Sequence, residues 1–300
     1  MQENPIVSVV CLCYNHSNFV IESLKSIQNQ TYENIEIIII DDFSADNSVK
    51  IINEFVENSP KIKFIVNKKN IGNTKSFNQA LRIAKGKYII DLAADDVLIP
   101  NCIDLQLDKF NKSKFPNLGI VYGNAENILE NGEHDSYYFK INNEKKVINK
   151  IATGDVYQTI ISSGNNFCSV SAMIKKTVFD DLTGYDESLV YEDLDFWIRA
   201  SRTYEIDFID AILVKKRILK NSLGSQFLNK NHKINESTYL ILKKATSLNK
   251  SKTEDLSLLT RINYEIFNCY KYKIYRLLIK NLNLKIYLNF RILFSFLKPK

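Results

Sequence analysis

Glycine and proline are scarce in this sequence, with nine glycines and five prolines among 300 residues. No two of the glycines form a G-x-G pair. Rossmann dehydrogenases and nucleotidyltransferases normally carry a glycine-rich phosphate loop of that kind near the start of the chain. Both enzyme classes are therefore weak alternatives for this protein.

Cysteine and histidine are also few and are not grouped. The five cysteines include no C-x-x-C pair, and the three histidines show no metal-ligand spacing. This pattern argues against a disulfide framework or a zinc site and favours a reducing compartment. We therefore expect a cytoplasmic protein in which Cys11 and Cys13, inside an apolar run, line the core or a site wall.

Long apolar segments are missing as well. No stretch reaches about 18 uncharged apolar residues, so we expect no membrane-spanning helix. The start, "MQENPIVSVVCLCYN", has no basic region before its short apolar run, which argues against a secretory signal. With 45% hydrophobic and 25% charged residues, the composition is that of one large folded domain with an appendage.

The positive charge is concentrated at the C-terminal end. Residues 266–300 carry eight Lys or Arg and no Asp or Glu, whereas the other 265 residues sum to −2. Leu, Ile, Phe and Tyr separate these basic residues, a pattern that favours a basic amphipathic helix at an anionic membrane surface. The alternative is a helix packed on the rest of the chain with solvated lysines. No nucleic-acid-binding motif is found.

The first hundred residues alternate between strand-like and helix-like patterns. Short apolar runs predict strands, and apolar residues three and four apart predict the helices between them. Strands are predicted at 6–14, 35–42, 62–66 and 87–93, and helices at 17–30, 44–58, 74–86 and 101–113. This βαβαβαβ order predicts an α/β fold with a mostly parallel sheet and helices on both faces.

After residue 115 the pattern is mixed and then becomes helical and basic towards the C-terminus. We expect strands at 118–128, 134–141, 167–174 and 206–218, and helices at 175–182 and 192–202.

Polar groups follow three of the predicted strands. They are Tyr14-Asn15, Asp41-Asp42 and Asp95-Asp96. Ligands of parallel sheets bind beyond the carboxyl ends of the strands, so this coincidence indicates a site.

Asp95 and Asp96 are adjacent carboxylates, which repel each other and raise each other's pKa. Mg²⁺ or Mn²⁺, which prefer oxygen ligands, would remove this repulsion. The alternative is a solvated turn that caps the next helix. Asp41 and Asp42 also allow two interpretations. They could cap the next helix, or a carboxylate could accept hydrogen bonds from a nucleobase or ribose at the end of the strand.

Glu192 and Asp193 stand at a predicted helix start, where acidic residues are favoured by the helix dipole. The functional alternative is a general base near a metal–phosphate site.

Taken in order, five segments resemble the family 2 glycosyltransferases over residues 5–225. They are Tyr14-Asn15, "IIIIDDFSAD", "NKKNIGNTKSFNQAL", "YIIDLAADDVLIP" and "GYDESLVYEDLDFWIRA". The resemblance implies the Rossmann-like GT-A fold and an inverting, nucleotide-sugar-dependent enzyme that uses Mn²⁺ or Mg²⁺. It implies a catalytic domain over 1–225, with a nucleotide-sugar half of about 1–115 and an acceptor half of about 116–225. A helical basic extension over 226–300 would follow.

The resemblance also assigns residues to the nucleotide. Tyr14 matches an aromatic that stacks on uracil, and Asp42 matches the carboxylate that hydrogen-bonds uracil, with Asp41 beside it. Asp95 would face ribose or metal, and Asp96 would be the closer metal ligand.

Two further assignments concern the reaction. Asp193 matches the catalytic base of the "ED" motif, and Lys75 would approach the diphosphate.

The sequence departs from the family pattern at three positions. Leu12 replaces a frequent proline, Ala93 replaces the first Asp of D-x-D-D, and Leu219 replaces the histidine of R-x-H-x-x-S, in which Arg217 and Ser222 are kept. The third departure removes one candidate metal ligand. A Q-x-x-R-W run is also lacking, which argues against a processive synthase.

The expected function is transfer of a sugar from a nucleotide-sugar, a UDP-sugar by the match of Asp42, to a hydroxyl of a glycan or lipid-linked acceptor. The setting would be bacterial surface polysaccharide, such as lipopolysaccharide or capsule, with the enzyme cytoplasmic or peripheral at the inner face of the membrane. The donor would be a hexosyl or N-acetylhexosaminyl nucleotide, although GDP- and dTDP-sugars also occur in the family. The alternative is a degenerate, non-catalytic module that binds a nucleotide or a membrane.

Overall fold

The computed structural model describes residues 4–57, 59, 61–163, 167–220 and 233–294. Its contacts divide the chain into two units. The first comprises Met1–Asp155, Cys168–Glu187 and Tyr204–Leu219, and the second comprises Val156–Phe167, Ser188–Thr203 and Lys220–Lys300.

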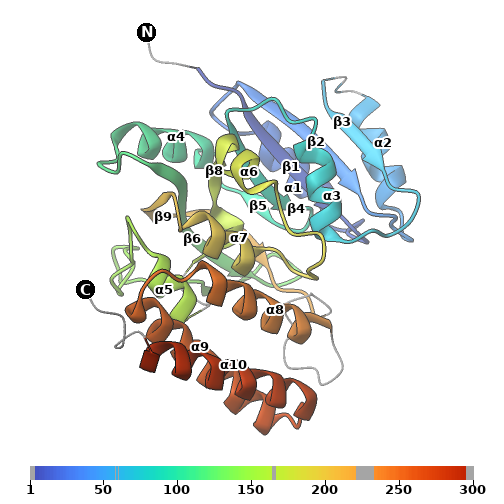
Figure 1. The fold of residues 1–300 in the computed structure, drawn as a ribbon. Coiled ribbons are helices and arrows are strands. Elements are labelled where there is room, and N and C mark those ends of the chain that lie inside the picture. The colour runs from blue at the N-terminus through green and yellow to red at the C-terminus, as the bar shows by residue number, and fades with distance from the viewer. Residues whose placement is uncertain (1–3, 58, 60, 164–166, 221–232, 295–300) are drawn as a thin grey trace. The chain divides into compact units, whose positions relative to one another are not determined.

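The first unit is built on one nine-stranded sheet with the order β3-β2-β1-β4-β8-β6-β9-β5, in which β7 pairs with β6 (Figure 1). Strand β1 is parallel to β2 and β4, and β2 is parallel to β3. Beyond β4 the sheet is mixed, because β8 runs antiparallel to β4 and β6. The strands are β1 (Val7–Cys13), β2 (Ile35–Asp41), β3 (Lys63–Val66), β4 (Tyr88–Ala93), β5 (Val97–Leu98), β6 (Leu118–Ile128), β7 (His134–Tyr137), β8 (Met173–Lys175) and β9 (Glu205–Arg217).

Helices cover both faces of the parallel half, as the alternating pattern predicts. Every residue of β1 is buried. Val9 and Cys11 pack in one cluster with Leu24 and Ile27 of α1, since alternate strand residues face the same side. The helices of this unit are α1 (Val20–Gln28), α2 (Ser48–Glu57), α3 (Asn73–Leu81), α4 (Cys102–Lys112) and α6 (Lys176–Leu182), with a 3₁₀ turn η1 (Ser169–Ser171).

The segment 167–174 differs from its predicted strand. Its first part forms η1, and only Met173–Lys175 pairs with the sheet. The hydroxyl of Ser171 explains the turn, because it donates to the carbonyls of Gly123 and Cys168 at 2.9 and 2.8 Å. A serine that bonds its own backbone competes with the strand ladder.

The second unit is helical. It contains α5 (Tyr157–Ser162), α7 (Asp193–Ala200), α8 (Lys233–Leu248), α9 (Lys252–Lys271) and α10 (Tyr275–Phe294). A capping box of Ser251 and Glu254 begins α9, and α9 and α10 form an antiparallel hairpin in which Arg291 bonds Asp255. The expected C-terminal helices are thus confirmed.

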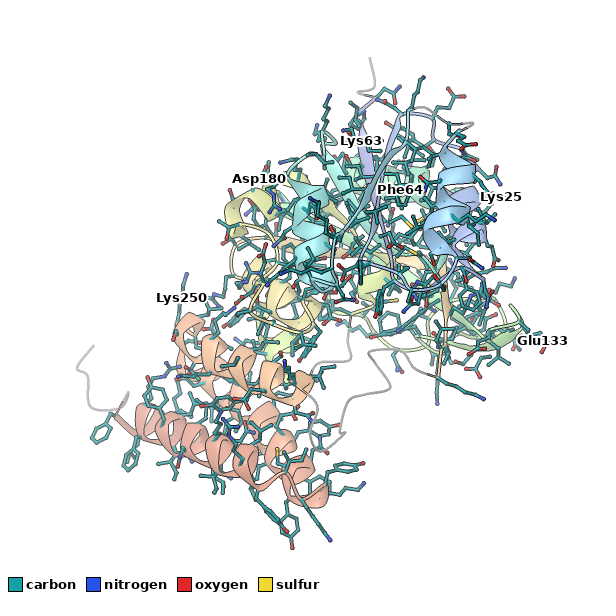
Figure 2. All side chains as sticks on the ribbon, turned by 90° about the vertical axis from the view of Figure 1, so that its right-hand side faces the viewer. Lys25, Lys63, Phe64, Glu133, Asp180 and Lys250 are labelled. Atoms are coloured by element: carbon teal, nitrogen blue, oxygen red, sulfur yellow. The ribbon has the colours of Figure 1, made fainter. Side chains whose placement is uncertain are left out.

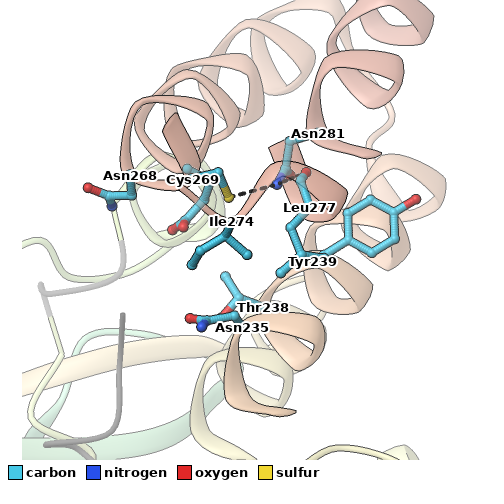
Figure 3. A pocket seen from close by; sticks show the side chains of 9 residues that line it. Asn235, Thr238, Tyr239, Asn268, Cys269, Ile274, Leu277 and Asn281 are labelled. Carbon is cyan, nitrogen blue, oxygen red and sulfur yellow. Dashed lines mark hydrogen bonds between the residues drawn. The ribbon is translucent and has the colours of Figure 1, made fainter. Parts of the chain in front are cut away.

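A small pocket lies among α8, α9 and α10 (Figure 3). Within it the amide of Asn281 donates to Sγ of Cys269 at 3.8 Å, and Ile274 and Leu277 supply apolar walls. These contacts join the helices of the hairpin. Among the helices of the described residues, none has both the length and the apolar character needed to cross a membrane.

Candidate functional site

The ends of three neighbouring strands carry the polar groups singled out from the sequence. Cys13 at the end of β1 pairs with Asp41 of β2, and Leu12 pairs with Ala93 of β4. Because these strands are parallel, Tyr14, Asp42 and the Asp95-Asp96 pair follow them at the same edge of the sheet. The structure therefore brings the three groups to one edge.

The loops after β1 and β2 are joined by hydrogen bonds. The backbone N–H of Asn15 donates to the hydroxyl of Ser44, and the N–H of Ala45 donates to Oδ1 of Asn15, both at 2.8 Å. Asn15 has a φ of 58°, a left-handed conformation that asparagine tolerates better than most residues. These bonds fix the backbone beside Tyr14, whose side chain remains 48% exposed and accessible to a ligand.

Asp41 shapes the loop that follows it. The carboxylate is fully buried and accepts hydrogen bonds from both the N–H and the hydroxyl of Ser44, at 2.8 and 2.6 Å. These contacts tie the carboxylate to the residue three positions on and so fix the start of the loop. They account for Asp41 without a ligand.

Asp42 holds the chain before α3. Its carboxylate accepts from the amide of Asn67 at 2.9 Å and from the N–H groups of Ile71 and Gly72 at 2.9 and 2.8 Å. A carboxylate offers about four acceptor positions, so one is left for a nucleobase N–H. The uracil contact of Asp42 stays a prediction. The hydrogen bonds to Asn67, Ile71 and Gly72 give Asp42 a structural role as well.

Lys75 lies in the first turn of α3 with an exposed side chain. Gly72 precedes this helix with a φ of 90°, which glycine adopts without strain, and no side chain caps the helix. A lysine beside uncapped N–H groups at a helix start suits an anion. The diphosphate contact of Lys75 remains a prediction.

Asp96 is buried at the end of β4, with 3% of its surface exposed. Its Oδ1 accepts from the backbone N–H of Arg217 at 2.9 Å. Burial first, and the like charge of Asp95 second, raise the pKa of the Asp96 carboxyl above its usual range. A cation beside the pair would lower that pKa again and favour two ionised carboxylates.

Arg217 was not predicted as a site residue, yet it organises this corner of the sheet. Only 4% of it is exposed, and its guanidinium donates to the carbonyl of Asp95 at 3.1 Å and to Glu22 at 2.6 Å. It also donates to the carbonyls of Leu129 and Glu130. The sequence feature that could have indicated Arg217 is its position as a basic residue at the end of a predicted strand. A buried arginine there needs several hydrogen-bond acceptors.

His16 is a second residue near the acidic pair that was not predicted as a site residue. Its Nδ1 atom is buried and has no hydrogen-bond partner among the described residues, and it lies 3.7 Å from Oδ1 of Asp95. The signal was its place two residues after Tyr14, in the loop at the strand edge. The imidazole is therefore positioned to contact Asp95 or a ligand bound there.

The donor set suits Mg²⁺ or Mn²⁺. These ions are usually held by one or two carboxylates together with substrate phosphates, so Asp95 and Asp96 suffice as protein ligands. The described residues contain no cluster of three or more His, Cys, Asp or Glu side chains able to hold a metal ion by themselves. The raised pKa of buried Asp96 fits a site that is completed by a cation and its substrate.

Asp91 lies within β4 and accepts a hydrogen bond from the hydroxyl of Tyr185 at 3.0 Å. Burial raises the pKa of Asp91 to about 7, and the Tyr185 bond opposes that shift. Asp91 thus belongs to a polar pair inside the first unit.

Asp193 begins α7 and lies in the second unit, half-buried, with its Oδ1 accepting from the N–H of Leu194 at 2.7 Å. Its neighbour Asp195 is buried and bonds Arg199 and Lys244, at 2.7 and 2.6 Å. Asp195 therefore has a structural role in the helix packing. The role of Asp193 as base stays a prediction. Leu219 is described, whereas Ser222 lies outside the described residues.

Comparison with known proteins gives the family. The model of "Glycosyl transferase family 2" matches residues 8–183, more than half of the chain. The chain belongs to glycosyl transferase family 2. An uncharacterized glycosyltransferase of Methanocaldococcus jannaschii is 34% identical over 224 residues, which cover 72% of each protein. A chondroitin synthase of Escherichia coli is 37% identical over 128 residues, which are 43% of this chain and 18% of the synthase.

Solved structures confirm the GT-A fold. S. aureus TarS 1–349 in complex with UDP-GlcNAc has a TM-score of 0.66 and 18% identity, with 84% of this chain and 70% of that chain covered. The mannosyltransferase PcManGT of Pyrobaculum calidifontis, in complex with GDP-Man and Mn²⁺, has a TM-score of 0.59 and 15% identity, with 98% and 84% covered. The family membership makes this protein a nucleotide-sugar-dependent glycosyltransferase.

Proposed function

We propose that this family 2 glycosyltransferase transfers a sugar from a UDP-sugar to a hydroxyl of a glycan or lipid-linked acceptor, with inversion at the anomeric carbon. One observation carries the proposal: Tyr14, Asp42 and the Asp95-Asp96 pair follow three neighbouring strands at one sheet edge. The accessible ring of Tyr14 and the carboxylate of Asp42 suit a nucleobase, and the Asp95-Asp96 pair suits a ribose and a cation bound to the diphosphate.

The choice of UDP rests on Asp42 and is supported by the relatives. TarS was solved with UDP-GlcNAc, and chondroitin and hyaluronan synthases are among the similar proteins. These names favour an N-acetylhexosaminyl or hexosyl donor and an acceptor in surface polysaccharide. The similarity to a GDP-Man-bound structure keeps a GDP-sugar as the second candidate.

In the proposed reaction Asp193 accepts the proton of the acceptor hydroxyl as that oxygen attacks the anomeric carbon. The new C–O bond forms as the bond to the diphosphate breaks, and the nucleoside diphosphate leaves with the bonding electrons. A bound Mn²⁺ or Mg²⁺ would neutralise the charge of the diphosphate. Asp95 and Asp96 would hold that ion, Arg217 keeps their loop in place through its bond to the Asp95 carbonyl, and Lys75 would approach the phosphates.

The first experiment is a calorimetric titration of UDP into the protein, with Mn²⁺ and then with chelator. Binding that needs both the metal and Asp96, lost in Asp96→Asn, supports the proposal. The matched control is Asp108→Asn, the same substitution at an exposed carboxylate that pairs only with Lys112 across one helix turn.

Three other outcomes are informative. UDP binding without metal would support a nucleotide pocket and contradict the role of the metal in binding. Binding of GDP but not UDP would indicate that the donor is a GDP-sugar. An absence of binding to any nucleotide would leave the degenerate module as the better description.

A further inference from the structure

Helix α10 has apolar residues on two faces. One face is buried against the rest of the second unit and includes Leu277, Leu284 and Leu288, together with the polar Asn281. The other is exposed and runs the length of the helix with spacings of three and four residues. We call it the apolar stripe: Tyr275, Ile279, Leu282, Ile286, Phe290 and Leu293.

The apolar stripe is unusual in its exposure. Five of its six side chains are 53–60% exposed, and Leu282 is 39% exposed. A surface helix normally turns polar side chains to water on the face opposite its core. Continuous exposed apolar surface of this kind marks an interaction site.

Exposed aromatic side chains are also present in the last turns of α9. Tyr264, Phe267 and Tyr270 are 56%, 59% and 69% exposed. Figure 2 shows ring side chains that project away from the last two helices. Tyrosine has an apolar body and a polar tip, so it is favoured at the boundary between lipid and water.

The charge beside the stripe selects the partner. Lys271, Lys273 and Arg276 are exposed, and residues 266–300 contain no acidic side chain. Two copies of this surface would repel each other, whereas anionic lipid headgroups would attract it.

We propose that the apolar stripe inserts into the interface of an anionic membrane, with α10 lying in the membrane plane and the neighbouring lysines and arginine on the headgroups. The helix keeps its buried face packed in the second unit, so the two alternatives considered for the tail, a packed helix and a membrane-surface helix, are combined. The membrane location suits the lipid-linked acceptor of the proposed function, but the lipid contact does not depend on catalysis.

Co-sedimentation with vesicles tests this proposal on the full chain. We expect binding to vesicles of phosphatidylglycerol and phosphatidylcholine that weakens with salt, and little binding to phosphatidylcholine alone. The double variant Ile286→Glu/Phe290→Glu should bind about tenfold or more weakly, because two inserted side chains become charged. Ile148→Glu is the matched control, since Ile148 is 63% exposed and lies in the first unit.

Retained vesicle binding by the double variant would overturn the proposal. So would a wild-type dimer that the double variant dissociates while vesicle binding is absent, because the stripe would then contact a second copy. Unchanged melting temperatures and unchanged UDP binding in the double variant would separate this test from that of the proposed function.

A separate observation concerns Phe43, directly after Asp42. Its φ is 69°, a left-handed conformation in which a bulky side chain is a genuine outlier. Glycine would adopt this conformation without strain. The side chain is nevertheless 53% exposed, so core packing does not explain why a phenylalanine stands there.

The surroundings of Phe43 indicate a function for its ring. The N–H of Asp42 donates to the carbonyl of Cys13 at 2.8 Å, and Ser44 accepts from Asn15. Phe43 and Tyr14 are therefore two exposed aromatic residues in loops that hydrogen bonds join at the sheet edge. We infer that Phe43 is a second aromatic contact for the nucleobase, a conclusion that rests on the proposed function.

Two substitutions separate binding from strain. Phe43→Ala and Phe43→Gly both remove the ring, and we expect UDP to bind about fivefold or more weakly to each, with KM raised and kcat little changed. Only the glycine variant also relieves the backbone, so it should melt at a higher temperature than the alanine variant. Ile148→Ala serves as the exposed apolar control.

Wild-type affinity for UDP in both Phe43 variants would overturn this inference and leave the proposed function intact. An absence of UDP binding by the wild-type protein would instead count against the proposed function.

Discussion

The two aspartate pairs of the first unit look alike in sequence and differ in the number of hydrogen-bond donors that surround them. Asp41 and Asp42 accept five hydrogen bonds between them, four of which come from Ser44, Ile71 and Gly72. Asp96 is buried with a single N–H donor, and its pKa is raised by burial and by Asp95. A following segment that supplies N–H groups makes a carboxylate structural. An adjacent acidic pair that receives a single N–H donor is suited to a cation.

Substitutions in the two pairs should therefore act on different properties. The largest effect is expected for Asp96→Asn, which should lower turnover by about 10²–10³-fold by weakening the stabilisation of the leaving diphosphate. Its free energy of unfolding should not fall, because asparagine can still accept from the N–H of Arg217 and one of two like charges is removed. Transfer assays and urea unfolding measure the two quantities.

Asp108→Asn should change neither quantity. Two results for Asp96→Asn would contradict the proposed difference between the pairs. One is wild-type turnover, and the other is a loss of stability like that expected for a structural carboxylate.

Arg217 supports the second pair through its side chain, so its removal should be costly for stability. Arg217→Met leaves Glu22 and the carbonyls of Asp95, Leu129 and Glu130 without their donor, and we expect a loss of about 3 kcal/mol in the free energy of unfolding. Urea unfolding measures it. The exposed Arg82, replaced in the same way, should cost much less, and equal losses would contradict the role given to Arg217.

Asp42→Asn should show the opposite profile to Asp96→Asn. An amide offers one acceptor oxygen, so one of the N–H groups of Ile71 and Gly72 would lose its partner. We expect a loss of about 2 kcal/mol in the free energy of unfolding, and a raised KM for the donor. A fully stable Asp42→Asn protein would show that these contacts are dispensable and would leave Asp42 to the nucleobase alone.

The sequence was sufficient for the parallel half of the fold and for placing Tyr14, Asp42 and the Asp95-Asp96 pair at one edge of the sheet. Continuous apolar runs such as Ile37–Ile40 are short and end at polar residues, so both the strand and the place where it ends can be identified directly. The same signal is missing for β5, two residues long, and for η1, where the hydroxyl of Ser171 overrides a strand-like pattern.

Residues that act through distant partners were harder to find. Arg217 contacts Glu22 and the Asp95 carbonyl, which are 195 and 122 positions away in the chain, and no local period encodes such contacts. Nor does the sequence show which aspartate pair receives backbone donors. That depends on where residues 71 and 72 lie in space.

The smallest effect is expected for Asp91, a third kind of carboxylate, with one tyrosine donor and no adjacent acid. Its pKa of about 7 in the folded protein lies above the ordinary value of about 3.9, so the folded state holds more protons between these values. The free energy of unfolding should therefore fall as pH rises from about 4 to 7, by at most about 1.4 kcal/mol per pH unit. Asp91→Asn should abolish this fall, so its advantage in stability over wild type should grow through that window and then stay constant.

Tyr185→Phe, which removes the donor that favours the ionised form, should extend the fall above pH 7. A pH-independent difference between Asp91→Asn and wild type would show that Asp91 is ionised as in water.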